Sequence, residues 1–499
     1  MVAQPFPPPV TIADRRDRGR QASRQTPPAV HADWTAAADR PDPVELLVAQ
    51  NVTRESDLVP IRHGRMMTSP LAFYRGAATV MAADLARTPT ADLQVQLCGD
   101  AHLSNFGGYA SPERHLVFGV NDFDETLPGP FEYDLLRLAA SFTIAACSNG
   151  FRRRDVRSVT GAVVRAYRTA MIDFADQRTL DVWYARIDES DIRAAMRSLR
   201  RRAAGPAEGS TAGKKGRRGK AEGRPKTRGA HLDKAIKATH KLLRKARTRD
   251  HLHALARFTE VVDGRPRITS NPPVVTPLRE LDGAWGLSGE QIRAVVQDQF
   301  EAYQSSLSAD RRQLLASYRI VDVARKVVGV GSVGTRAFMV LLQGRDEQDP
   351  LFLQVKEATR SVLEQQLPAT RFATPGQRVV EGQRLMQSSS DIFLGWTNGM
   401  AEDRFYYWRQ LRDMKVSAAV ETMDPLRMTF YARLCGWTLA HAHARSGDPV
   451  AIAAYLGQED DLDRALVEFS ARYAAQNADD HRRFLAAITD GRVEARQDV

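Results

Sequence analysis

The sequence predicts an α+β fold in which long helical segments surround one shorter segment rich in β-strands. Strongly apolar runs with helical spacing cover 133–147 and 425–445, and short apolar runs separated by loops mark three consecutive strands between 320 and 356. The chain has 499 residues, of which 43% are hydrophobic, so it can bury substantial cores. No apolar run reaches the roughly 20 residues that span a bilayer, and we expect no membrane segment.

The first part of the chain is expected to pass from a disordered tail into helices. Residues 1–40 are rich in Pro, Arg and Ala without periodicity, which predicts disorder. Residues 41–199 are mainly helical in pattern, and they contain the apolar helix 133–147. Two short strands and then a Pro- and Gly-containing turn precede that helix, at 93–98, 115–120 and 127–130.

A basic insertion carries most of the net charge of the chain. The sequence holds 71 Lys and Arg and 60 Asp and Glu, a net charge of +11. Between 200 and 229 there are 11 Lys and Arg and two Glu, which places +9 of that charge in one Gly-rich stretch. Because this stretch has almost no apolar side chains, we expect 200–230 to be a disordered insertion. Nucleic-acid binding through 200–229 stays open as an alternative, but no aromatic residues are interleaved there for base stacking.

The second part of the chain is expected to contain a β-rich lobe between two helical segments. We expect a helical connector over 231–317, a β-rich lobe over 318–412 and a helical segment over 413–499 that completes the larger lobe. The strand patterns at 321–328, 337–342 and 351–356 predict an antiparallel meander. Only three Cys are present, widely spaced, which excludes a disulfide framework and is typical of a reducing cytosol.

The first motif with chemical meaning follows the strand at 93–98. Asp100 and Asn105 place a carboxylate and an amide oxygen on one short loop, and Asp122 and Asp124 follow the next strand. A carboxylate there can accept a proton from an attacking hydroxyl, and grouped oxygen ligands suit Mg²⁺. Asp134 then opens the apolar helix. Each residue alone could be a turn or capping residue, but their spacing together favours a site.

The second motif is a Gly-rich segment within the β-rich lobe, at Gly329, Gly331 and Gly334. The residues after it continue as a strand, whereas a dinucleotide-binding fingerprint would continue as a helix. This order is typical of the strand–loop–strand lid over the phosphates in protein-kinase-type sites. Lys356 ends the third strand, where its ammonium could contact phosphate, although it could also be a solvated lysine. We expect Glu381 to orient Lys356, with Glu364 as the alternative.

These segments resemble two families. The residues 98–105, Cys-Gly-Asp-Ala-His-Leu-Ser-Asn, resemble the HGDLHPGN loop of aminoglycoside and choline phosphotransferases, and 121–135 resemble their ID[FW]D…GxxxxDLA segment. Cys98 replaces the usual His of that loop. The chain from about residue 45 also resembles the uncharacterised bacterial family called domain of unknown function 2252.

The phosphotransferase resemblance implies a protein-kinase-like fold with two lobes and a role for each matched residue. It implies that Asp100 is the catalytic base and that Asn105 and Asp122 hold metal. Our interpretation adds Asp124 as a further metal ligand. It implies that Asp134 braces the catalytic loop. Three glycines, Lys356 and Glu381 would correspond to the nucleotide-binding lobe; these glycines are Gly329, Gly331 and Gly334. In kinases the Gly-rich lobe precedes the catalytic loop, but here it follows by more than 200 residues.

We therefore expect a circular permutation. The helix 425–445 would take the place of the helix that normally leads into the catalytic loop, which is physically permissible because contacts rather than chain order define a fold. A competing loop in the usual kinase order lies at the end of this helix, at His441, His443, Arg445 and Asp448. Five residues beyond Asp448 stands Ala453, which cannot bind metal, and the helix dipole explains basic residues at a helix end. We expect this second loop to be structural.

The expected function is ATP- and Mg²⁺-dependent transfer of a phosphoryl group to a hydroxyl of a small molecule, in the cytoplasm. Asp100, Asn105 and Asp122 would be catalytic, and Asn105, Asp122 and Asp124 would hold the metal. The small-molecule acceptor follows from the resemblance alone. Two alternatives stay open: a catalytically weak nucleotide-binding regulator, and a nucleic-acid-associated protein that acts through the basic insertion.

Overall fold

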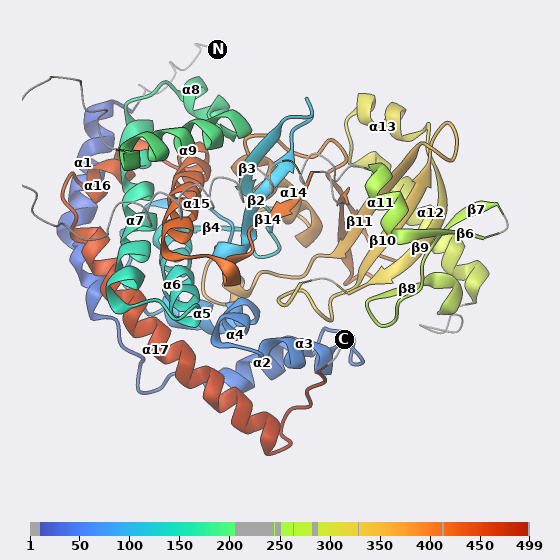
Figure 1. Ribbon diagram of the computed structural model, residues 1–499, viewed down its shortest axis with the longest axis horizontal. Helices are drawn as coiled ribbons and strands as arrows, with labels where there is room; N and C mark the ends of the chain where they lie inside the picture. Colours follow the sequence, from blue (N-terminus) through green and yellow to red (C-terminus); the bar gives the residue numbers. More distant parts are fainter. Residues whose placement is uncertain are drawn as a thin grey trace, which may run out of the picture.

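The computed structural model describes residues 10–204, 244, 251–262, 264–281, 288–327, 329–411 and 414–497. The fold is mixed α+β, as predicted, with a helical part and a β-rich part side by side (Figure 1). Among the described residues, no helix combines the length and the apolar character needed to cross a membrane. The predicted insertion 200–230 lies mostly outside the described residues, and 200–204 form the end of a helix.

The helical part is built from both ends of the chain. Its first helices are α1 (Ile12–Gln25), η1 (Pro28–Asp33), α2 (Pro43–Asn51), α3 (Val59–Met66), α4 (Pro70–Gly76), α5 (Ala78–Leu85), α6 (Glu132–Ser148), α7 (Arg153–Ala175), α8 (Thr179–Tyr184) and α9 (Glu189–Ala204). Its last helices are η6 (Val420–Thr422), α15 (Pro425–Ser446), α16 (Pro449–Leu456) and α17 (Asp461–Thr489). Helix α6 is buried on every side, because nearly all of its residues are apolar or small, and α7, α15 and α17 pack around it (Figure 1).

The N-terminal region differs from its prediction. The disordered tail is wrong for Ile12–Gln25, which form α1. Thr11 and Asp14 make a reciprocal capping box at its start. The small residues Gly19 and Ala22 let α1 lie directly on α16. Composition alone predicted disorder here, because it carries no information about a helix cap or about a contact with a helix more than 400 residues away.

The β-rich part is a six-stranded antiparallel sheet in the order β12-β13-β11-β10-β9-β8. Its strands are β8 (Val275–Pro277), β9 (Arg319–Lys326), β10 (Ala337–Gln343), β11 (Pro350–Glu357), β12 (Gly395–Asn398) and β13 (Phe405–Gln410). The predicted meander is confirmed as β9, β10 and β11. The other elements of this part are α11 (His251–Phe258), β6 (Thr259–Val262), β7 (Arg265–Ile268), η3 (Leu278–Glu280), α12 (Gly289–Ser305), α13 (Ala309–Leu315), η5 (Val362–Gln365) and α14 (Pro375–Met386).

The segment 231–317 is not the purely helical connector that was expected. It contains the β6–β7 hairpin, and β8 adds a sixth strand to the sheet by pairing with β9. The strand β8 has only three residues, and one is Pro, so it shows no periodicity that a sequence pattern could reveal. Helix α12 covers one face of the sheet, where the Tyr303 ring stacks on Trp408 at 4.6 Å between centroids.

Two small sheets lie between these parts (Figure 1). They comprise β1 (Gln94–Leu97) with β4 (Leu127–Pro130), and β14 (Val416–Ser417), β2 (Phe106–Ala110), β3 (Leu116–Val120) and β5 (Ile187–Asp188) in that order. The strands β1 and β3 confirm the predictions for 93–98 and 115–120. The expected turn at 127–130 is wrong, because these residues pair antiparallel with β1. In this two-stranded ribbon, proline is tolerated because the β4 edge needs few N–H donors. The short helix η2 (Leu103–Asn105) connects β1 to β2.

Candidate functional site

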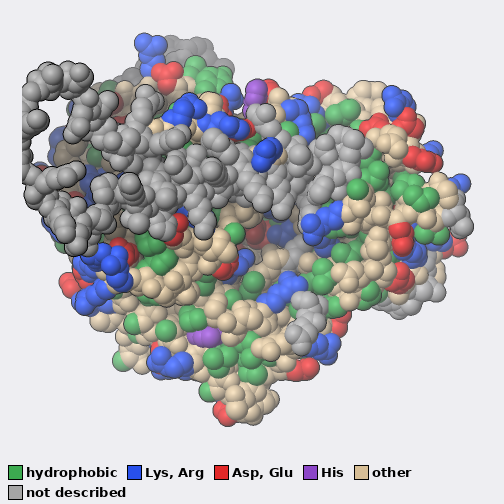
Figure 2. All heavy atoms as spheres, viewed as in Figure 1, with side chains coloured by type: hydrophobic (Ala, Val, Ile, Leu, Met, Phe, Trp, Pro, Cys, Tyr) green, Lys and Arg blue, Asp and Glu red, His purple; other side chains and the backbone are tan. Residues whose placement is uncertain are grey.

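A cavity of about 420 Å³ lies between the six-stranded sheet and the β2–β3 region, and it collects residues of both sequence motifs. Asn105 and Asp122 line it from one side, and Gly329 and Lys356 line it from the other. These two pairs are more than 200 residues apart in the chain. Figure 2 shows Lys and Arg side chains around a hollow in the middle of this face of the molecule. The structure therefore brings together four of the predicted site residues.

Lys356 is held by two carboxylates at the wall of this cavity. Its Nζ lies 2.5 Å from Oδ2 of Asp124 and 3.7 Å from Oδ1 of Asp122, and the residue is only 2% exposed. Burial opposes the charge of the ammonium, but Asp122 and Asp124 outweigh it and raise the pKa of Lys356. The lysine is thus charged and fixed in place, as a group that contacts phosphate must be.

Asp124 joins the Gly-rich segment to the sheet. Besides Lys356, its carboxylate accepts hydrogen bonds from the hydroxyls of Tyr407, at 2.6 Å, and Ser332, at 3.1 Å. Burial acts to raise the pKa of Asp124, but Lys356 and Tyr407 hold it at about 2. These contacts occupy the Asp124 carboxylate, and its predicted role as a metal ligand stays a prediction.

Asp122 keeps a buried oxygen without a hydrogen bond. No donor in the described part of the chain lies within hydrogen-bond distance of its Oδ1, and Lys356 Nζ is 3.7 Å away. Burial, with the nearby Asp124 charge, raises the pKa of Asp122. Buried carboxylate oxygens without partners are rare in folded proteins. This oxygen is therefore the best placed in the cavity to accept a cation.

The loop with Asp100 is braced from below by Asp134, as the resemblance implied. The Asp134 carboxylate accepts hydrogen bonds from the backbone N–H groups of Cys98, at 2.7 Å, and Gly99, at 3.0 Å. Gly99 has a φ of +81°, and a Cβ there would lie 2.1 Å from the Glu125 carbonyl oxygen. Only glycine fits this turn.

Asp100 does not line the cavity but lies directly behind it. The backbone carbonyl of Asp100 accepts a hydrogen bond of 2.8 Å from Nδ2 of Asn105, which does line it. The Asp100 carboxylate is paired with the Arg137 guanidinium at 2.5 Å. Burial raises the pKa of Asp100, while the Arg137 charge acts against the rise. His102 lies 3.7 Å from Asp100, but burial holds its pKa well below the usual range, so its ring is neutral.

The structure does not support the predicted partners of Lys356. Glu381 pairs with Arg384 on its own helix at 2.9 Å, and Glu364 lies 3.6 Å from Arg378. Helix α14 does contact the site, but through Arg378, which donates to the carbonyl oxygens of Asp124 and Thr126. The sequence prediction was wrong because two nearer carboxylates, at the end of a strand in the other motif, take the position expected for a helix glutamate.

The Gly-rich segment is fixed to the helical part. Gly329 and Ser332 line the cavity. Gly334 has a φ of +91°, a conformation that favours glycine, and its carbonyl accepts a hydrogen bond of 2.8 Å from the Glu55 N–H. Arg54 donates to the neighbouring Val333 carbonyl at 2.5 Å. Gly331 packs near the Arg75 carbonyl, where a Cβ would lie 3.3 Å away. The segment is thus docked against residues that precede the first motif.

The second loop, at the end of α15, is structural, as expected, and one of its residues supports the site. His443 is fully buried, with Nε2 at 3.3 Å from Oδ2 of Asp134 and Nδ1 at 2.9 Å from the Tyr167 hydroxyl. His441 contacts the Val182 carbonyl, and Asp448 caps α16. Helix α15 also reaches the first motif through the Tyr431 hydroxyl, which donates to the Leu103 and Phe106 carbonyls.

Several residues of the site were missed by the sequence interpretation. Arg137 stands three residues after Asp134 on the same helix, a spacing that could have indicated a common face. No local pattern marks the others; they come from separate elements that only the fold brings to the cavity, namely Arg75, Tyr407, Arg409, Lys415 and His443. Arg409 donates to the Gln354 side chain and the Asn121 carbonyl, and burial lowers the pKa of Lys415 to about 7.

The oxygen atoms that the protein offers as metal ligands suit a magnesium ion that would also bind phosphate oxygens. No group of three or more His, Cys, Asp or Glu side chains that could hold a metal is present in the described ranges. Mg²⁺ does not need one, because it commonly binds one or two protein oxygens together with phosphate oxygens and water. Asp122, with its unpartnered Oδ1, and Asn105 are the residues that would hold it.

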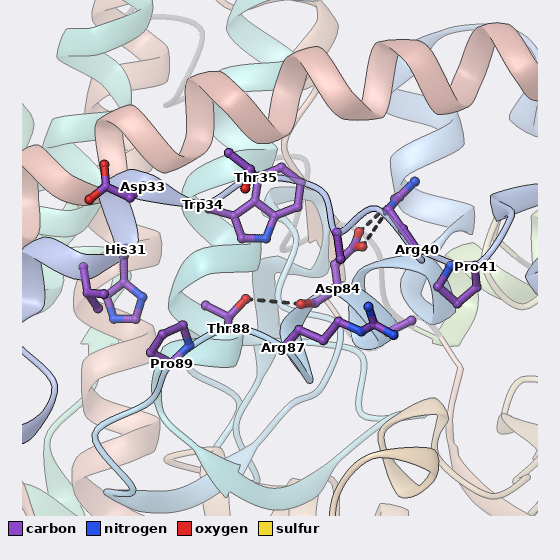
Figure 3. A pocket seen from close by; sticks show the side chains of 13 residues that line it. His31, Asp33, Trp34, Thr35, Arg40, Pro41, Asp84, Arg87, Thr88 and Pro89 are labelled. Atoms are coloured by element: carbon purple, nitrogen blue, oxygen red, sulfur yellow. Dashed lines mark hydrogen bonds and ion pairs between the residues drawn. The ribbon is translucent and has the colours of Figure 1, made fainter.

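A second cavity, of about 240 Å³, lies in the helical part beneath α17 (Figure 3). His31, Trp34, Arg40, Asp84 and Arg87 are among the residues around it. It contains none of the predicted site residues, and Arg40 is committed to Asp84 and to Asp480 at 2.6–2.8 Å. The cavity between the six-stranded sheet and the β2–β3 region is therefore the candidate active site.

One protein family matches the segments that supply both walls of that cavity. The family described as "Uncharacterized protein conserved in bacteria (DUF2252)" matches the chain over residues 54–224 and 220–487. The chain belongs to this family. The DUF2252 match includes the segments with Asp100, Asp122 and Lys356, and its two stretches meet within the predicted basic insertion. No match was found among curated proteins or among solved structures.

Proposed function

We propose that this DUF2252 protein is an ATP- and Mg²⁺-dependent phosphotransferase with a protein-kinase-like, circularly permuted fold, and that its acceptor is a hydroxyl group of a small molecule. One observation carries the proposal. Lys356, Asp122, Asn105 and the Gly-rich segment line a single cavity although they come from distant parts of the chain. Chance clustering of turn residues would not produce this arrangement.

The order of elements in the sheet supports nucleotide binding. The Gly-rich segment follows β9, and Lys356 lies in β11, two strands further along an antiparallel sheet. Protein kinases also carry a Gly-rich loop after a first strand and a lysine in a third. In this proposal Lys356 leaves Asp124 or shares it, and its ammonium contacts the phosphates. The cavity wall adds the Arg409 guanidinium, which suits a polyanion.

The proposed chemistry needs little beyond positioning and charge. When bound, Mg²⁺ would offset the negative charge of the phosphates. Asp122 and Asn105 would hold it, and Asn105 in turn is oriented by its hydrogen bond to the Asp100 carbonyl. The Asp100 side chain does not line the cavity but is 18% exposed, and in this proposal it would orient the acceptor hydroxyl and take its proton at a carboxylate oxygen as the phosphoryl group moves. Arg137 would keep that carboxylate in one orientation.

Helix α15 supports the proposed permutation. Its Tyr431 contacts the loop 98–105, and its His443 contacts Asp134, which holds that loop. In the proposed permutation, α15 takes the place of the helix that leads into the catalytic loop. The chain nevertheless reaches α15 only after the sheet. Contacts of a kinase-like lobe can therefore be met by a chain in a different order.

The full-length protein, incubated with Mg²⁺, labelled ATP and a metabolite mixture, tests the proposal. We expect ATP turnover and label transfer by the wild type, with losses of about 100-fold or more in Asp122→Ala and Lys356→Met. The control variant is Asp310→Ala, at an exposed position of α13, which is expressed and purified in the same way and should keep wild-type turnover. Absence of ATP turnover in a folded wild type, or full turnover in Asp122→Ala, would contradict the proposed activity.

A nucleotide-binding regulator with weak catalysis is the second candidate, and the Arg137 pair of Asp100 favours it. An arginine 2.5 Å from the proposed base reduces the ability of that carboxylate to accept a proton. Equilibrium binding of ATP measured beside turnover separates the two. Binding that depends on Lys356, without turnover in the wild type, would favour the regulator.

A further inference from the structure

Arg75 is an arginine without a partner on the wall of the proposed active site. It comes from α4, outside both sequence motifs, and lines the cavity with Asn105 and Asp122. Its Nε is buried and has no hydrogen-bond partner. Within the described part of the chain, no carboxylate lies within ion-pair distance of Arg75, and no acceptor receives a hydrogen bond from its side chain.

The buried arginines in the described part of the chain all use side-chain donors; they are Arg62, Arg137, Arg168 and Arg378. Nε of Arg62 and Nε of Arg378 also lack a partner, but the terminal nitrogens of both residues donate hydrogen bonds, whereas those of Arg75 do not. This is the normal state, because a guanidinium withdrawn from water costs free energy unless its donors are used. An arginine that faces a cavity with its donors unused is suited to a carboxylate or phosphate group, which it can bind through two parallel hydrogen bonds.

The position of Arg75 points to the acceptor side of the cavity. Its charge acts on Asp100 and His102 of the catalytic loop. Its own backbone carbonyl lies against the Gly-rich segment at Gly331. Arg75 therefore stands between the segment that would cover the phosphates and the loop that would receive the acceptor hydroxyl.

The charge of the cavity wall disfavours a cationic acceptor. Its lining residues include six Lys or Arg and only two Asp; these are Arg75, Arg114, Lys326, Lys356, Arg409 and Lys415, with Asp122 and Asp391. Part of this charge is already offset, because Lys356 is paired with Asp122 and Asp124 and burial lowers the pKa of Lys415 to about 7. The wall as a whole is still basic, so aminoglycosides and choline, which are cations, would meet repulsion here.

We propose that the acceptor is an anionic hydroxyl compound, such as a sugar phosphate or a hydroxy acid, and that Arg75 binds its phosphate or carboxylate group. This inference rests on the proposed phosphotransferase function and narrows its substrate class. Arg75 is a binding residue here, and the transferred group moves from ATP to the hydroxyl of the acceptor with release of ADP and one proton.

The first arm of the test measures turnover. Full-length protein is given labelled ATP, Mg²⁺ and one of three pools: sugar phosphates with hydroxy acids, neutral sugars and polyols, or choline with kanamycin. We expect label transfer to the anionic pool. Arg75→Ala should raise the KM for that acceptor about 10- to 100-fold, and Arg75→Lys should raise it less. The KM for ATP should stay within about twofold. Transfer to the cationic pool, or an equal rise in the KM for ATP, would overturn the assignment.

The second arm does not depend on turnover. Calorimetry measures the binding of inorganic phosphate to the protein saturated with Mg²⁺ and a non-hydrolysable ATP analogue. We expect phosphate to bind the wild type and to bind Arg75→Ala at least about tenfold more weakly, with Arg178→Ala, an exposed arginine, as the matched control. Equal binding by wild type and Arg75→Ala would overturn the role of Arg75. Failure of ATP turnover alone would overturn the proposed function while this arm still decides whether Arg75 binds an anion.

Discussion

Replacement of Arg40 by Met should destabilise the helical part strongly. Arg40 makes four hydrogen bonds of 2.6–2.8 Å, two to Asp84 on α5 and two to Asp480 on α17 (Figure 3 shows the contact with Asp84). The two carboxylates are only 5% and 2% exposed. Asp84 also accepts a hydrogen bond from the Tyr473 hydroxyl at 2.9 Å. Met fills a similar volume but leaves two carboxylates buried without their cation.

The size of the effect follows from that burial. Removal of one partner of a buried ion pair costs about 3 to 5 kcal/mol, most of it from the charge left behind. Two charges are left behind here, so we expect at least about 4 kcal/mol at pH 7.

Urea unfolding followed by circular dichroism at pH 7 measures the loss. The triple variant Arg40→Met, Asp84→Asn, Asp480→Asn should recover more than half of the loss, because no buried charge remains. Arg87→Met breaks an exposed pair with Asp39 near the same cavity, and it should leave the midpoint unchanged. A loss in Arg40→Met no larger than that of Arg87→Met, or a triple variant that recovers nothing, would refute the reasoning.

Three further predictions concern single residues. Tyr407→Phe removes a hydrogen bond to the half-buried Asp124 carboxylate and should cost about 1.5 kcal/mol of unfolding free energy. Tyr406→Phe, next to it, should change little, and equal losses would contradict this account. His31 is 1% exposed and burial lowers its pKa to about 4, from 6.5. Because the unfolded chain takes up that proton at higher pH, wild-type stability should fall by up to about 3 kcal/mol between pH 6.5 and 4. In His31→Gln the pH profile should be flatter over this range, and an unchanged profile would rule out His31 as the cause. Glu381→Ala should leave the Kd for ATP within about twofold, measured by calorimetry, since Glu381 pairs with Arg384; a loss of tenfold or more would restore the sequence-based assignment.

Local pattern predicted the elements well where a whole face is apolar. The meander β9–β11 is rich in apolar residues because α12 packs on one of its faces and a cluster with α11 on the other, and α6 is mostly apolar because it is buried on every side. Short or atypical elements escaped prediction. Strand β4 carries two prolines in four residues, and α1 is strongly polar, so only their partners β1 and α16 explain them.

Motifs predicted which residues gather at the site but not how they pair. Asp122 and Lys356 were expected to share a cavity, and they do. The predicted partner of Lys356 was wrong. The kinase-like pattern predicts a glutamate on a helix, but Asp124 lies nearer to Lys356 in the fold. Arg75 and His443 could not be found, because each reaches the site by a contact between segments that no periodicity links.

The position of α15 also sets the order in which the protein can mature during its synthesis. The loop 98–105 is made early, but its supports Tyr431 and His443 follow roughly 340 residues later, a delay of about 17 to 70 s at ordinary rates of bacterial translation. Until then, the apolar face of α6 has neither α15 nor α17 to cover it. The nascent chain therefore passes most of its synthesis with an exposed core and an unfinished cavity, and the site closes only as the last helices leave the ribosome.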